Sequence, residues 1–460
     1  MTGPVVAIIA LAVAGMPLFC VLGAVGLIGM HHSGTPLSGA LADVYRLAGA
    51  EAVSLSTIPL FTFAGYLMTK AKTAQRLVRM AEALFGWIPG GLAAMTVVTM
   101  AFFTVFTGAS GVTIVALGGI LLPELERTGY PKRFALGVVT GSGAIGLLFP
   151  PALPLIVYAI IFALTAGHAS DAGAPVDFSI ERFLTAGILP GILLVAIVAT
   201  YCIIRGWRAH VPRTPLDLKK FGKAFWEAKW ELPIPFFIIG LMMFGLATIP
   251  EVAALTALYV FVIEVFVYKE ISIKRDLFSV SRESMTLVGA IFMKIAAATI
   301  LTAYFVDAEV PERLFTWMSQ YVHSSWAFLM VLNVLLLLVG CLMDIFSAIV
   351  VVVPLIVPAA AQFHINPYHL GVIFLLNLEI GYLLPPAGLN LFIAAFRFNR
   401  PITDVYRAVV PFILLMIVAL GIVTAAPTLS TALPNWLAKH AKVPTAQPAE
   451  PSPVEAPLPP

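Results

Sequence analysis

The chain has 460 residues, of which 60% are hydrophobic and only 11% are charged, and its mean hydropathy is +0.98. A soluble protein of this size could not bury so much apolar surface, and repeated apolar runs of about 20 residues are typical of membrane-spanning helices. Because the runs are continuous and do not alternate, a transmembrane β-barrel is excluded. The small net charge of +3 is spread over loops, which argues against nucleic-acid binding. The three cysteines lie in apolar runs and form neither a disulfide framework nor a metal-ligand spacing.

The N-terminal half opens with a span and a surface helix. Residues 5–30 are apolar but interrupted at Pro17, which favours one kinked span or two half-spans. We expect a membrane helix here and not a cleaved leader, because no basic stretch or small-residue cleavage pattern is present. A span at 53–68 leads into residues 70–87, where apolar side chains recur at helical spacing among basic ones. This pattern predicts an amphipathic arm helix on the cytoplasmic face.

Two interrupted segments follow this arm. Residues 90–126 are long enough to cross the membrane, but a polar, glycine-containing break cuts them at 107–111. Basic residues stand at both ends, so both ends are expected on the cytoplasmic side and the segment is predicted to be a re-entrant hairpin. Residues 134–164 are predicted to be a transmembrane helix broken between 141 and 151. Residues 183–204 then return to the inside.

The C-terminal half repeats this plan after a basic, aromatic-rich cytoplasmic linker at 206–230. The predicted spans and interrupted segments are, in order, 233–248, 252–268, 285–305, a hairpin at 326–363 with its break at 340–344, a broken helix at 368–396, and a last span at 409–426. An arm helix is predicted at 310–324, now on the outer face because acidic residues open it. Residues 428–460 are predicted to form a disordered, proline-rich tail.

A divergent internal repeat relates residues 106–158 to residues 339–392. The Pro150–Pro151 and Pro385–Pro386 pairs lie 235 residues apart (385 − 150), and we expect this register to drift by a few residues at the hairpins. One hairpin is expected to open inward and the other outward, which predicts two inverted repeats over 1–205 and 231–427. The predicted fold is therefore an all-α polytopic membrane protein with two re-entrant hairpins and two broken transmembrane helices.

The breaks are the predicted binding site of a transporter. A hairpin tip inside the membrane exposes backbone groups, which persist only where they line a polar cavity. Helix N-termini suit an anionic substrate, whereas free carbonyls and hydroxyls suit Na⁺. Oxygen ligands for a cation are supplied at the breaks by Thr107, Ser110, Thr113 and Asp344. We find no nucleophile elbow, zinc-protease motif or ATP-binding loop, so neither enzymatic activity nor ATP use is expected.

Several of these residues have alternative interpretations. Asp344 is a cation ligand or a helix-capping residue, and Ser110 is a tip ligand or part of a small-residue packing patch. Asn377 is a site or gating residue, or it makes a hydrogen bond between helices. Glu379 contacts the transported species directly or pairs with a buried cation such as Lys294. Lys294 bridges to an acidic residue or extends its ammonium group toward the interface.

Both repeated stretches resemble one known family. TGASGVTIVALGGILLPELERTGYPK, followed by GLLFPP, and GCLMDIFSAIVVVVPLIVPA, followed by NPYHLGVIFLLNLEIGYLLPPAGLNLF, resemble the hairpins and breaks of the large membrane subunit of TRAP (tripartite ATP-independent periplasmic) transporters. The resemblance covers roughly residues 5–426, and it implies an elevator-type fold in which a scaffold braced by arm helices holds a mobile transport domain.

The resemblance also implies a function. It implies Na⁺-driven uptake of an organic acid, such as a dicarboxylate or sialic acid, across the bacterial inner membrane, with Na⁺ as coupling ion and no cofactor. The implied partners are a small membrane subunit and a periplasmic substrate-binding protein. The candidate cation-binding residues are Thr107, Ser110, Gly111, Gly146, Gly340, Asp344 and Gly381. The candidate substrate-binding residues are Gly108, Ala109, Pro150, Pro151, Asn377, Pro385, Pro386, Gly388 and Asn390.

Three other functions are alternatives to this one. A stand-alone Na⁺- or H⁺-coupled dicarboxylate or citrate carrier of the same superfamily would need no delivery protein. A channel would need a continuous polar lining, whereas polar groups here cluster at the breaks. A membrane enzyme would need convergent His, Asp or Ser side chains within spans, and the chain has too few.

Overall fold

The computed structural model describes residues 15–34, 36, 38–39, 42, 44–45, 55–170, 178–211, 217–244 and 246–440. All regular structure within these ranges is helical, and six of the described helices are long and apolar enough to cross a membrane. The prediction of a multi-pass α-helical membrane protein is therefore confirmed. The beginning of the predicted span at 5–30 lies outside the described residues, and the rest of it forms α2 (Leu18–Ser33).

The first half of the chain contributes α2 and the following elements, taken in order. They are α5 (Thr57–Lys70), α6 (Thr73–Phe85), α7 (Gly91–Thr107), α8 (Ser110–Arg127), α9 (Lys132–Ser142), the 3₁₀ helix η1 (Ile145–Leu148), α10 (Leu153–Ser170), α11 (Ile180–Ala186) and α12 (Ile188–Arg208). The helix α13 (Leu218–Ala228) lies within the predicted linker.

The second half begins with α14. Its elements are α14 (Pro233–Met243), α15 (Ile249–Val262), the π helix η2 (Ile263–Val267), α16 (Leu277–Asp307), α17 (Val310–Ser319), α18 (Ser325–Leu342), α19 (Ile345–Gln362), α20 (Pro367–Gly381), α21 (Leu389–Arg397), α22 (Ile402–Ala425) and α23 (Thr428–His440).

Helix α23 corrects the prediction that the chain is disordered from residue 428 onward. Ser430, Pro434 and Leu437 are buried at a spacing of three to four residues, and α23 packs against α11. The proline and alanine content of the whole tail predicts disorder, whereas the spacing of these buried residues is typical of an amphipathic helix. The remainder of the predicted tail, residues 441–460, lies outside the described residues.

Both predicted breaks in the long apolar runs are confirmed. The first helix of the N-terminal pair, α7, ends at Thr107, because Gly108 adopts a left-handed conformation (φ +62°) and Ala109 is extended before α8 begins. In the C-terminal pair, Met343 and Asp344 are extended between α18 and α19. The α7–α8 turn is called tip 1 and the α18–α19 turn is called tip 2.

The repeat register is tighter than the sequence predicted. The second helices of the two tips, α8 and α19, begin 235 residues apart (345 − 110), and so do α9 and α20 (367 − 132). The expected drift at the hairpins was therefore wrong. Both proline pairs, Pro150–Pro151 and Pro385–Pro386, lie in the gaps η1–α10 and α20–α21 and contain cis peptide bonds. The segment from α9 through η1 to α10 bends by 41° at its break.

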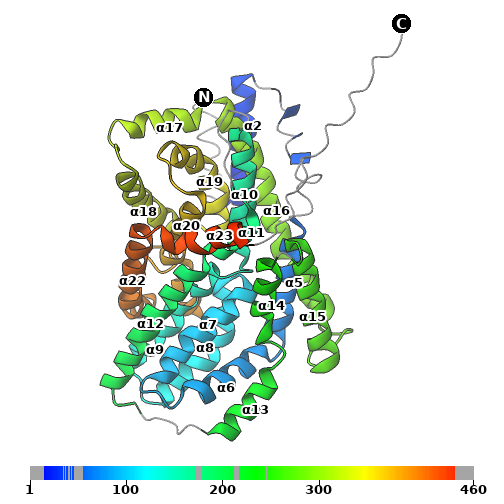
Figure 1. Ribbon diagram of the computed structural model, residues 1–460, viewed down its shortest axis with the longest axis vertical. Helices are drawn as coiled ribbons and strands as arrows, with labels where there is room; N and C mark the ends of the chain where they lie inside the picture. Colours follow the sequence, from blue (N-terminus) through cyan, green and yellow to red (C-terminus); the bar gives the residue numbers. More distant parts are fainter. Residues whose placement is uncertain are drawn as a thin grey trace.

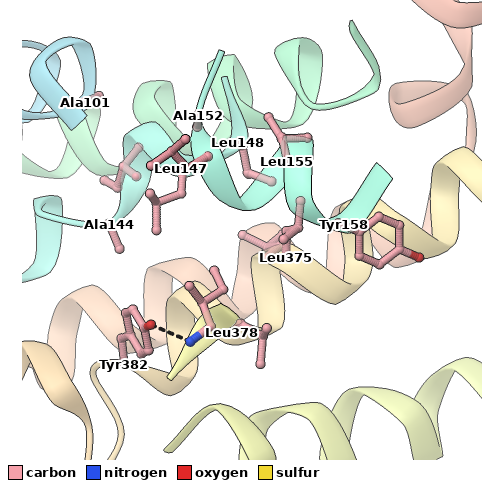
Figure 2. Close-up of a cluster of buried hydrophobic side chains, with 14 of the residues drawn as sticks. Ala101, Ala144, Leu147, Leu148, Ala152, Leu155, Tyr158, Leu375, Leu378 and Tyr382 are labelled. Atoms are coloured by element: carbon pink, nitrogen blue, oxygen red, sulfur yellow. Dashed lines mark hydrogen bonds between the residues drawn. The ribbon is translucent and has the colours of Figure 1, made fainter. Parts of the chain in front are cut away.

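The two halves interlock across these breaks. Within each half the first hairpin helix packs beside the broken helix, as α7 does on η1 and α9, and α18 on α20. Between the halves, α8 packs on α21 and α10 on α19. In Figure 2, Leu147, Leu148 and Leu155 of the first broken helix face Leu375 and Leu378 of α20. A buried apolar core thus joins the two breaks.

The two predicted arm helices correspond to α6 and α17. They lie at opposite ends of the molecule, with α6 at the bottom and α17 at the top of Figure 1. Helix α6 buries one face, including Leu77, Val78 and Ala81. This placement agrees with the expected inversion of the arms between the two halves.

Candidate functional site

Tip 1 gathers hydroxyl and carbonyl oxygens around three threonines. The Thr107 hydroxyl lies 3.2 Å from the Thr113 hydroxyl and 3.4 Å from the carbonyl oxygen of Ala109. The Thr104 hydroxyl lies 2.8 Å from that of Thr113 and 3.0 Å from the carbonyl oxygen of Gly143. All three threonine side chains are buried. Such neutral oxygens, drawn from side chains and backbone, are the ligand types that hard cations take.

Sequence reasoning missed Thr104 and Gly143. Thr104 stands one helical turn before Thr107 on the same face of α7. The i, i+3 spacing could therefore have predicted that the two hydroxyls lie close together. Gly143 lies at the end of α9, and only the packing of α9 against α7 brings its carbonyl group to tip 1.

A direct hydrogen bond joins tip 1 to the second broken helix. The Ser110 hydroxyl donates to the Asn390 side-chain oxygen at 2.8 Å, and both side chains are buried. This bond brings together two predicted site residues that are 280 positions apart and places the N-termini of α8 and α21 side by side. The Asn390 side-chain nitrogen has no hydrogen-bond partner within the described residues.

Glycine permits the close approaches at tip 1. A Cβ atom on Gly108 would come within 2.6 Å of Leu153, and one on Gly111 within 2.5 Å of Ile393. These glycines therefore allow α10 and α21 to pack tightly against the tip.

Two further glycines occupy equivalent positions in the repeat. A Cβ atom on Gly146 would come within 2.1 Å of the Ala101 carbonyl oxygen, and one on Gly381 within 2.6 Å of Gly340. Gly146 and Gly381 are themselves 235 residues apart (381 − 146). Each lets a broken helix contact the first helix of its own hairpin backbone to backbone, so close packing accounts for glycine at both positions.

Asp344 is engaged on several sides at tip 2. Its carboxylate accepts hydrogen bonds from the Ser347 backbone N–H at 3.1 Å and from the Ser347 hydroxyl, so it caps the N-terminus of α19. The Lys294 ammonium group of α16 donates to both carboxylate oxygens, at 2.9 Å and 3.0 Å. The capping interpretation is therefore supported, and Lys294 pairs with Asp344 and not with Glu379.

The residues before the second break have different surroundings. Asn377 donates to the Asn333 side-chain oxygen at 2.7 Å, and Asn333 donates onward to the Thr424 hydroxyl at 3.2 Å, which supports a hydrogen bond between helices. Glu379 is fully buried in α20, and neither of its carboxylate oxygens has a hydrogen-bond partner within the described residues. Both side chains lie inside the core that joins the breaks.

The two proline pairs differ in exposure. Pro150 and Pro151 are buried, whereas Pro385 and Pro386 are exposed. The carbonyl oxygen of Pro386 accepts a hydrogen bond from the Tyr406 hydroxyl at 2.9 Å. The Gly388 backbone folds closely over Tyr382 in the same break, where a Cβ atom would come within 2.6 Å of the Tyr382 carbonyl oxygen.

Comparison with known proteins identifies the family. Residues 5–429 match the family described as "Tripartite ATP-independent periplasmic transporter, DctM component". The chain is 34% identical over 433 residues to the C4-dicarboxylate TRAP transporter large permease protein DctM of Rhodobacter capsulatus, covering 94% of this chain and 98% of that protein. It is 32% identical over 421 residues to the isethionate TRAP transporter permease protein DctMQ of Oleidesulfovibrio alaskensis, covering 91% and 64%.

A solved structure supports the fold. The Alcanivorax borkumensis YdaH transporter superposes with a TM-score of 0.61 at 14% identity, covering 95% of this chain and 98% of the other. At that identity the likeness concerns the fold alone. The match over residues 5–429 and the identity with full-length relatives agree with the arrangement of hairpins and broken helices described above, and this chain belongs to the DctM family of TRAP transporters, as a large permease subunit.

Proposed function

We propose that this chain is the transport subunit of a Na⁺-driven importer of an organic acid in the bacterial inner membrane. A dicarboxylate, sialic acid or a similar carboxylate would be delivered by a periplasmic binding protein, and a small membrane subunit would complete the complex. The similar proteins named above for C4-dicarboxylate and isethionate support an anionic substrate. The observation that carries the proposal is the hydrogen bond between Ser110 and Asn390, which joins a hairpin tip to the opposite broken helix.

The oxygens of tip 1 suit the coupling cation. Na⁺ is a hard cation that takes neutral oxygens, and carbonyl groups freed by broken helices are its usual ligands in transporters. The Thr107 and Thr113 hydroxyls and the carbonyl oxygens of Ala109 and Gly143 lie together there. A second cation site is proposed at tip 2, which contains Asp344 and lies beside the close approach of the Gly340 backbone to Gly381.

The neighbouring helix N-termini suit the substrate anion. The N-termini of α8 and α21 lie side by side, which brings the positive ends of two helix dipoles together. The unpaired amide nitrogen of Asn390 adds a donor at that position, and the Ser110 hydroxyl fixes this side chain by donating to its oxygen. A carboxylate bound here would accept a hydrogen bond from the Asn390 amide and lie close to the oxygens of tip 1 that are proposed to bind the cation.

An elevator motion is the proposed mechanism. The two hairpins and two broken helices form one interlocked core, which is the proposed transport domain with re-entrant hairpins. Helices α2, α5, α15 and α16 pack on one another beside it and form the proposed scaffold. Each repeat would then expose its own tip to one side of the membrane in turn.

The test is uptake into proteoliposomes. This chain would be reconstituted with its candidate small subunit and binding protein, a Na⁺ gradient imposed, and labelled C4-dicarboxylates, sialic acid and isethionate supplied. We expect uptake that requires Na⁺ and all three proteins. Uptake by this chain alone would contradict the tripartite proposal and favour a stand-alone Na⁺- or H⁺-coupled carrier.

A further inference from the structure

An ion pair connects α16 to tip 2. Lys294 lies near the middle of α16, a helix of 31 residues, at a depth far from both ends of the span. Its ammonium group lies within 3.0 Å of both oxygens of Asp344, and the two side chains are 19% and 35% exposed. A cation in the middle of a span is costly without a partner, so the pair explains how Lys294 is retained there.

The contacts of Asp344 belong to two different helices. The Ser347 N–H and hydroxyl are on α19 itself and move with the tip, whereas Lys294 is on α16. The tip is also held from the other side, because the backbone N–H of Ile345 donates at 2.6 Å to the hydroxyl of Tyr382, the residue that follows α20 (Figure 2). Loss of the Lys294 contact would therefore leave the tip capped by Ser347 and bound to Tyr382, with the packing of α19 on α16 as its remaining contact with that helix.

The ammonium group also stands where a coupling cation would bind. A carboxylate oxygen that coordinates Na⁺ directs its lone pairs at the ion, and here both oxygens already accept from Lys294. Two cations at contact distance from one carboxylate repel each other, so occupancy by one disfavours the other.

We propose that Lys294 is a built-in competitor for the cation at Asp344, and that Na⁺ binds there only as the lysine leaves. This inference rests on the proposed Na⁺ coupling. Binding of the ion at tip 2 then removes the charged attachment of the tip to α16 and leaves the packing of α19 on α16, which links loading of the transport domain to a weaker hold on the scaffold. The empty carrier, with the pair formed, stays attached.

Cys341, close to Asp344 in the sequence, provides a reporter at tip 2. It is 6% exposed, so its rate of alkylation measures how often the tip opens. In the complete complex, with Cys20 and Cys202 replaced by serine and alanine, this rate would be followed against Na⁺ at constant ionic strength, with choline as the replacing cation. The quantity compared is the Na⁺ concentration that gives the half-maximal change.

Lys294→Met removes the competitor while keeping an apolar side chain of similar length. We expect the half-maximal Na⁺ concentration to fall about tenfold, the factor equivalent to an ion pair of about 1.4 kcal/mol. Lys294→Arg retains a cation and should stay near the wild-type value. Arg282→Met removes a cation from an exposed position on the same helix and serves as the matched control.

Asp344→Asn tests the other partner, since asparagine still caps a helix but carries no charge. It should abolish the Na⁺ response. If the wild type responds to Na⁺ and Lys294→Met responds at the same concentration, the competition is refuted while Na⁺ coupling stands. If no variant responds to Na⁺ and uptake also ignores Na⁺, both the competition and the proposed coupling are refuted.

Discussion

The buried guanidinium of Arg76 offers a sharp test of how the arm helix α6 is held. Arg76 is only 4% exposed and forms ion pairs with Glu231, Glu264 and Glu270. Its guanidinium carbon also lies 3.8 Å from the centre of the Tyr268 ring. Glu231 and Glu264 are each 1% exposed, so one arginine is shared by two fully buried carboxylates and connects the arm to the α13–α14 turn and to η2.

Arg76→Met removes the charge and keeps most of the apolar stem. Breaking a buried ion pair by deleting one partner costs about 3–5 kcal/mol, because the remaining charges stay buried without compensation. Arg79→Met is the matched control on the same helix. Arg79 is 54% exposed and pairs with Glu227 at 2.9 Å, so its loss should cost about 0–1 kcal/mol.

The assay is thermal unfolding in detergent, followed by the fraction of protein that remains monodisperse. Comparison at one heating rate is required because unfolding of such proteins is irreversible. We expect the apparent Tm of Arg76→Met to fall by about 3–10 °C and that of Arg79→Met to change little. Equal falls in the two variants would refute the argument from burial.

The pH dependence of the Tm separates the electrostatic contribution of Arg76 to stability from its packing contribution. Burial raises the pKa of the Glu231 carboxyl above its ordinary value, and the nearby Arg76 opposes this by lowering it. A raised folded-state pKa contributes stability that is present at low pH and is lost as the pH rises toward that pKa. Removing Arg76 raises the pKa of Glu231 further, so in Arg76→Met this carboxyl becomes protonated as the pH falls and no longer needs a cation. The difference in Tm between Arg76→Met and the wild type should therefore become smaller as the pH is lowered from about 8 to about 5. A constant deficit would assign the loss to packing.

Three other predictions concern the tips and breaks. Gly381→Ala should lower stability by about 1–3 kcal/mol, because its Cβ would meet the α18 backbone at 2.6 Å, whereas Gly421→Ala, with nothing within 4 Å, should not; thermal unfolding compares them. Asp344→Ala should be less stable than Asp344→Asn by about 1 kcal/mol, since only asparagine preserves the cap; equal melting would deny the cap a role. Ser110→Ala removes the hydrogen bond to α21 and leaves the buried Asn390 oxygen unpaired, so it should lower stability by about 1–3 kcal/mol. At matched amounts of folded complex it should reduce substrate uptake about tenfold, and unimpaired uptake would exclude this hydroxyl from the site.

The fold could be predicted largely because each break in its apolar helices is caused by the residues at the break itself. Glycine and polar residues at 107–111 and 340–344 cannot continue an apolar helix without cost, and both breaks fall there. The repeated proline pairs gave the register, which also placed Gly146 and Gly381 at equivalent positions. The family resemblance on the same residues is confirmed by the comparisons.

The contacts within the site could not be predicted in the same way. Ser110 meets Asn390, and Lys294 meets Asp344, only because four helices from distant parts of the chain pack together. The sequence left two choices for Lys294, and an acidic partner turned out to be right, but which acid it meets depends on the rotation of α16 against α19. Helix α23 could not be predicted from the composition of residues 428–460, because the proline-rich part of this range outweighs the short helical pattern at its start.

The repeat also explains why the two tips differ in chemistry. Shifted by 235 residues, Ser110 corresponds to Ile345 and Asn390 corresponds to Leu155, and both of these apolar side chains are buried. The backbone frame, with α8 on α21 and α10 on α19, is therefore repeated, while the polar pair exists at one crossing only. At tip 2 the polar contact is instead the ion pair between Asp344 and Lys294 of α16. The repeated frame therefore has a neutral hydrogen bond at tip 1 and an ion pair at tip 2, and the proposed anion and cation sites use this difference.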